Sequence, residues 1–158
     1  MFYDLFLFLH LIGAITIFAG IAVAGVSLET ARRRSDTREI YSILSLSRAG
    51  ALMVAIGTIM AGVLGLLLVD LGHWGYQTLW VELATGLFVV ALALGYLGGQ
   101  APKRARLLAG ALEPNSAGTE PSARLSRLLN SRLARLCNYA SLILMVAILY
   151  LMVFKPGS

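Results

Sequence analysis

The sequence predicts an all-α polytopic membrane protein, a bundle of four transmembrane helices with an amphipathic interfacial helix before the last span. Of its residues 58% are hydrophobic and only 13% are charged, whereas soluble proteins carry about 25% charged residues. Four apolar runs are each close to the roughly 20 residues that a helix needs to cross a bilayer. Backbone groups in lipid must be satisfied within their own segment, so we expect helices, in a single membrane domain over residues 1–158.

The first predicted span covers residues 5–28 and would extend about 36 Å as a helix, which exceeds the apolar core of a bilayer by roughly 6 Å. It contains no formally charged side chain and one imidazole, that of His10. Residues 22–24 have the small-x-small form of a signal-peptide cleavage site. However, no basic segment precedes the run, and arginines follow it. We therefore predict a retained first helix.

The other predicted spans cover residues 49–69, 79–99 and 136–154. Every Lys and Arg except Lys155 lies in the first or the third connection between spans. Because positive charge marks cytoplasmic loops, this pattern places both termini outside the cytoplasm, and we expect a multi-pass protein of the inner (cytoplasmic) membrane. The same distribution explains the net charge of +5 without a nucleic-acid partner. It predicts contact with a lipid bilayer that has an anionic inner leaflet.

The third connection has two predicted parts. Residues 113–122, with two prolines and several small polar residues, predict a flexible linker. After it, leucines recur at helical spacing while Arg124, Arg127 and Arg135 project mainly from another face. This pattern is typical of an amphipathic helix that lies on the inner leaflet before the last span.

Rows of small residues predict where helices approach one another closely. Gly57, Ala61 and Gly65 form such a row in the second span. Ala91 and Gly95 begin another in the third span, which Gly99 continues. We expect these rows to pack the four spans together. Homo-oligomerisation through the same residues is the alternative.

Ionisable residues in a span are functional candidates by default. His10 lies within the first span, and Glu82 lies one turn into the third span from the same side. If these spans are neighbours, the Glu82 carboxylate could bond one imidazole nitrogen and set its tautomer. The alternative is a neutral His10 that has only a packing role and donates to a backbone carbonyl or to Glu82. His73, in a short interfacial loop, is a weaker candidate.

Several reaction types are excluded by what the sequence lacks. It contains no Gly-rich phosphate loop, no HExxH and no CxxC motif. The single cysteine, Cys137, and two histidines are too few for a classical metal site, so we predict none. A hydrolase or ATPase is therefore not expected, and whether the protein is an enzyme stays open.

The chain resembles the uncharacterised bacterial integral membrane family known as domain-of-unknown-function family 2269, over about its first three spans, which implies a bacterial inner membrane. The resemblance rests on a leucine-histidine pair and the small residues after it, and on a later glycine pair and tryptophan loop. These segments are residues 9–14 and 18–20, then Gly62, Gly65, Trp74, Gly75 and residues 80–81. More distantly the chain is similar to copper-resistance CopD and HemJ-type membrane proteins. This similarity implies a first-span histidine, here His10, that is associated with haem or copper.

Two functions follow as hypotheses. The first is a b-type haem or redox-linked membrane protein with His10 as axial ligand, Glu82 behind it, and a second ligand from His73, Met60 or Met145. The alternative is a non-catalytic membrane subunit that stabilises or anchors a larger complex through its small-residue faces. A transporter is the weaker third hypothesis, since the spans contain few polar groups.

Overall fold

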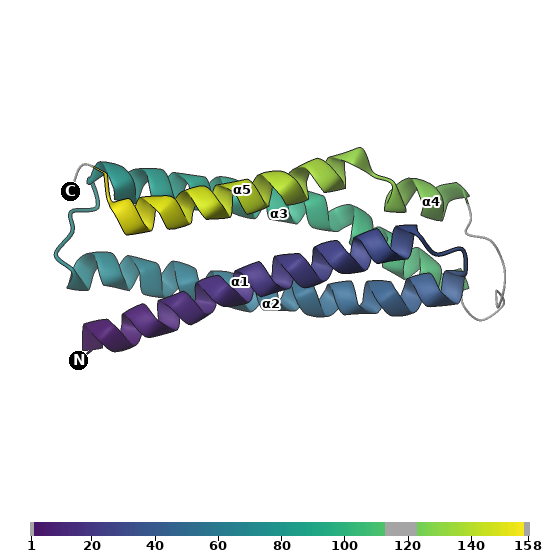
Figure 1. Ribbon diagram of the computed structural model, residues 1–158, viewed down its shortest axis with the longest axis horizontal. Helices are drawn as coiled ribbons and strands as arrows, with labels where there is room; N and C mark the ends of the chain where they lie inside the picture. The colour runs from purple at the N-terminus through teal and green to yellow at the C-terminus, as the bar shows by residue number, and fades with distance from the viewer. Residues whose placement is uncertain (1, 113–122, 157–158) are drawn as a thin grey trace.

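The computed structural model describes residues 2–112 and 123–156, and the regular elements of these residues are helices (Figure 1). They are α1 (Phe2–Arg32), α2 (Thr37–Leu71), α3 (Leu79–Leu112), α4 (Ala123–Leu129) and α5 (Arg132–Phe154). The first three helices and the segment Ala123–Phe154 are each long and apolar enough to cross a membrane. The predicted four-span helical class is therefore confirmed. The predicted linker at 113–122 lies outside the described residues.

The helices are longer than the predicted spans. α2 contains 35 residues and α3 contains 34, which corresponds to about 50 Å each, against a bilayer core of about 30 Å. The extra turns are polar on one side, so hydropathy alone did not reveal them. Asp36 begins α2, because its side chain accepts a 3.0 Å hydrogen bond from the backbone nitrogen of Arg38.

The helices associate as two antiparallel pairs (Figure 1). α1 packs along α2, and α3 packs along α5, while the pairs meet chiefly through α2 and α3. The described chain begins and ends at the end of the bundle that holds the α2–α3 connection. We call this the tryptophan end, after Trp74 and Trp80 there. The opposite end, with the α1–α2 connection and α4, is the basic end.

Glycines bring α1 and α2 into backbone contact at two places. A Cβ atom built on Gly57 would lie 2.7 Å from the carbonyl oxygen of Gly13, and one on Gly20 would lie 2.6 Å from that of Gly50. Any larger residue at these positions would force the helices apart. Gly57 and Ala61 of the predicted row in α2 therefore pack the bundle internally, against α1.

The row predicted in α3 behaves differently. Ala91 is buried, but no atom of the described residues lies within 4 Å of a Cβ placed on Gly95 or Gly99. The expectation that this whole row packs the four spans together is thus wrong for its two glycines. The reason is that α3 uses another face, at Gly98, to contact Cys137 of α5.

The basic end contains its own hydrophobic core. Leu125 and Leu129 of α4 are 0% and 3% exposed and pack against residues from all three long helices before it. These residues are Leu28, Ala31, Ile40, Leu44, Ala105 and Ala109. The predicted amphipathic helix is present, but these two leucines face protein, because α1, α2 and α3 extend far enough to cover them.

Candidate functional site

His10 is buried between α1 and α2, with 6% of its surface exposed. Its Nδ1 atom lies 2.9 Å from the backbone carbonyl oxygen of Ala61. A carbonyl oxygen only accepts hydrogen bonds, so Nδ1 carries the proton and donates. The other ring nitrogen, Nε2, then keeps its lone pair. Among the described residues, Nε2 has no hydrogen-bond partner, and the atom is not fully buried.

The backbone of α2 makes room for this imidazole. A Cβ atom on Gly65 would lie 3.0 Å from Cε1 and 3.4 Å from Nδ1 of His10, so the ring rests against a surface that only glycine leaves open. One turn further along α1, the contact of Gly13 with Gly57 and Ala61 holds the two backbones close. The same row of small residues that packs the pair therefore also sets the position of His10.

The structure does not join Glu82 to His10. α1 pairs with α2, and α3 pairs with α5, so the first and third spans are not packed partners. The Glu82 side chain is exposed in the first turn of α3. Nδ1 of His10 instead donates its hydrogen bond to the backbone carbonyl of Ala61. The carboxylate expected behind His10 is thus replaced by a backbone carbonyl, a partner type that sequence reasoning named only as the alternative.

His73 is also separate from His10. It lies exposed in the α2–α3 connection, and its backbone is left-handed (φ 55°). The backbone N–H of His73 donates a hydrogen bond to the Asp70 carbonyl. α2 continues from Ala61 to Leu71 before reaching it, a rise of about 15 Å. Two ligands of one metal ion lie within about 4–5 Å of each other, so these two imidazoles of one chain do not share an ion.

The two methionine candidates differ in burial. Met145 of α5 is 7% exposed and belongs to a core cluster that also contains Ile17 and Ala61. Met60 is half-buried. Among the described residues, no group of three or more His, Cys, Asp and Glu side chains could hold a metal ion. His10 is therefore the one sequence-predicted site residue that the structure both buries and orients.

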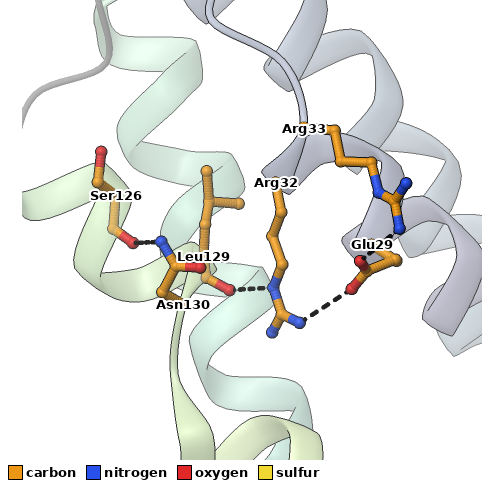
Figure 2. Close-up of polar contacts among 6 residues, drawn as sticks. All are labelled: Glu29, Arg32, Arg33, Ser126, Leu129 and Asn130. Atoms are coloured by element: carbon orange, nitrogen blue, oxygen red, sulfur yellow. Dashed lines mark hydrogen bonds and ion pairs between the residues drawn. The ribbon is translucent and has the colours of Figure 1, made fainter.

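A second polar cluster, not expected from the sequence, lies at the basic end (Figure 2). The Arg32 side chain is only 9% exposed. Its Nε donates to the Leu129 carbonyl, and its Nη1 lies 3.2 Å from Oε2 of Glu29. Arg33 contacts the other Glu29 oxygen at 3.3 Å. Since Leu129 ends α4, the guanidinium stabilises the negative end of that helix dipole.

Sequence reasoning assigned Arg32 to topology, like the other arginines of its loop. Only the Glu29–Arg32 spacing, three residues on one helix, could have indicated a local ion pair. Its contact with α4 spans 97 residues of sequence and has no local signature.

A third cluster joins the helices at the tryptophan end. The rings of Trp74 and Trp80 meet edge to face, with centroids 5.7 Å apart. Nζ of Lys155, which follows α5, lies 4.4 Å from the centre of the Trp74 ring. Gly72 is required here, because a Cβ atom on it would lie 2.5 Å from Trp74. This cluster connects the end of α5 to the α2–α3 connection.

Comparison with curated proteins and with solved structures found no match. It therefore provides no support for the more distant similarity to CopD and HemJ-type proteins. The family model DUF2269, described as a predicted integral membrane protein, matches residues 4–156. The match includes α5 and so extends beyond the three spans on which the resemblance was based. By this match, the chain belongs to the DUF2269 family of predicted integral membrane proteins.

Proposed function

We propose that this protein is a membrane haem-binding protein in which Nε2 of His10 is an axial ligand of haem b. The observation that carries the proposal is the 2.9 Å hydrogen bond from Nδ1 of His10 to the carbonyl of Ala61. Histidines that bind metals almost always donate their other ring N–H to a carboxylate, a backbone carbonyl or water. That bond selects the tautomer whose Nε2 can coordinate.

The residues around His10 fit this role. The hydrogen bond from Nδ1 to the Ala61 carbonyl raises the basicity of Nε2. This bond and the contact with Gly65 also hold the ring in one orientation, which lowers the entropy cost of binding. One histidine is sufficient for a haem site of the globin kind. Met145 is our candidate for a second ligand, because it shares a core cluster with Ala61. A bound haem would supply one-electron transfer.

Visible absorption spectroscopy tests the proposal. The protein would be purified in detergent from cells with ample haem, and spectra recorded before and after reduction with dithionite. We expect a Soret band, α and β bands after reduction, and band intensities that correspond to about one haem per chain. The variant His10→Gln can still donate a hydrogen bond to Ala61 but binds haem iron poorly, so it should lose these bands.

His73→Gln is the matched control and should keep the bands of the wild-type protein. A colourless wild-type protein, or equal haem in His10→Gln and wild type, would refute the assignment of His10. Met145→Leu then tests the second ligand: the reduced bands should shift or broaden while haem is still bound. Unchanged bands would exclude Met145.

A second candidate function is that of a membrane subunit which binds another transmembrane helix. The observation that favours it is the open space at Gly95 and Gly99 on α3, next to Tyr96, which is 72% exposed. Close helix approach in lipid requires such small residues. Gly95→Leu together with Gly99→Leu should abolish co-purification of a partner or homo-oligomer, while Gly86→Leu should not. A wild-type protein that purifies as a monomer without a partner would refute it.

We also propose a location in a bacterial inner membrane. The arginine distribution supports an orientation with the basic end in the cytoplasm and both termini outside.

A further inference from the structure

A hollow of about 360 Å³ lies on α1 at the basic end. It is lined by Val26, Glu29, Thr30, Arg33 and Arg34. Val26, Glu29 and Thr30 are three or four positions apart on α1, so they share one face of the helix, and Arg33 and Arg34 follow its last residue. This face is turned away from the core at the basic end, because Leu28 and Ala31 of α1 make the core contacts there.

The arginines of this hollow are available to an external anion. The side chains of Arg33 and Arg34 are 78% and 51% exposed. They lie 3.3 Å from Glu29 and 3.5 Å from Glu39, respectively. Exposed pairs of this kind contribute little stability, so a phosphate can displace the carboxylates. Arg32 differs, since its guanidinium is buried against Leu129.

The hollow also has an apolar side. Val26 is 67% exposed and lies within the apolar run that ends at Leu28. Arg33 is seven positions after Val26, a rise of about 10 Å. The headgroup layer on each side of a bilayer is roughly 5–8 Å thick. A lipid chain against Val26 would thus place its phosphate near Thr30 and the arginines.

We propose that this hollow, independently of haem binding, is a specific site for one anionic phospholipid. Guanidinium groups bind phosphate through two parallel hydrogen bonds, which lysine cannot reproduce. Two arginines and one carboxylate leave the lining with a net positive charge, complementary to an anionic headgroup. Glu29 competes with the phosphate for Arg33 and lowers the affinity of the site.

The test is lipid titration of the purified full-length protein, with bound lipid counted by native mass spectrometry. Phosphatidylglycerol is the anionic probe and phosphatidylcholine the neutral one. We expect one tightly bound phosphatidylglycerol per chain, and at least about tenfold weaker binding in the double variant R33Q/R34Q. The matched control R124Q/R127Q removes two exposed arginines from α4, at the same end but outside the hollow. It should stay within about twofold of wild type.

The variant Glu29→Gln should change the phosphatidylglycerol affinity in the opposite direction. It keeps both arginines and removes the carboxylate that competes for Arg33. Phosphatidylglycerol should therefore bind more tightly, and this result does not depend on whether R33Q/R34Q folds. Equal weakening by R33Q/R34Q and R124Q/R127Q would overturn the proposal in favour of diffuse attraction. Displacement of the lipid by millimolar inorganic phosphate would overturn it as well, since Val26 would then add nothing.

Discussion

Gly13 and Gly57 face each other between α1 and α2 so closely that a Cβ atom on Gly57 would lie 2.7 Å from the Gly13 carbonyl oxygen. Lipid provides no hydrophobic drive for helix association, so close backbone contacts of this kind, here and between Gly20 and Gly50, hold the pair together. One turn before Gly13 in sequence, the His10 imidazole reaches the Ala61 carbonyl. Packing and candidate site therefore depend on the same close approach.

Gly57→Ala should destabilise the protein by about 1–3 kcal/mol, because the added methyl group meets backbone that cannot move aside. Denaturation in mixed detergent micelles measures this loss. Gly95→Ala is the matched control, since no atom of the described residues lies within 4 Å of its new Cβ. It should be neutral or slightly stabilising through helix propensity. Equal stability of the two variants would contradict the close contact.

Gly65→Ala should disturb the His10 site with little effect on overall stability. The new methyl group would lie 3.0 Å from Cε1 of the imidazole, a side chain that can rotate away. If His10 binds haem, we expect reduced occupancy or shifted absorption bands in this variant. Gly86→Ala, which meets no described atom within 4 Å, should leave the spectrum unchanged. Identical spectra for all three proteins would show that Gly65 does not position the ring.

Arg32→Gln should release α4 from the rest of the basic end. The variant loses the hydrogen bond to Leu129 and the ion pair to Glu29, and hydrogen bonds of charged groups contribute about 1.5–3 kcal/mol. Hydrogen–deuterium exchange over Ala123–Leu129 should rise more in this variant than in Arg33→Gln, because the Arg33 side chain is 78% exposed. Unchanged protection of α4 would mean that its two buried leucines hold it alone.

Lys155→Gln should loosen the tryptophan end by about 0.5–2 kcal/mol, because it removes the ammonium group 4.4 Å from the Trp74 ring centre. Trp74 and Trp80 are the two tryptophans of the chain, so tryptophan fluorescence reports the change directly. Lys155→Arg keeps a cation over the ring and should retain the wild-type spectrum and stability. If Lys155→Arg behaves like Lys155→Gln, the cation–π contact is not the stabilising feature.

Cysteine labelling tests the proposed orientation. In a Cys137→Ala background, which has no other cysteine, single cysteines would replace the exposed residues His73 and Ser35. A membrane-impermeant maleimide should label His73→Cys in intact cells and Ser35→Cys only after the cells are opened. The reverse pattern would place the basic end outside the cytoplasm.

The helical membrane class, with four long apolar helices, followed from the sequence alone. Apolar runs of this length have few alternatives in lipid, and hydropathy records them directly. The polar extensions of α2 and α3 were harder to predict from hydropathy, because their hydrophobic residues recur on one side of the helix only. Their role as a core for Leu125 and Leu129 required knowledge of which helices pack together.

The candidate site shows the same division. The sequence by itself determined that His10 lies within a span and that a row of small residues lies in α2. Only the tertiary structure decided that His10 bonds Ala61 rather than Glu82, and that Arg32 holds the end of α4. The physical reason is that spans of similar hydropathy can pair in several ways. The choice depends on the register at which glycines on two helices meet, a relation between distant residues that no local pattern records.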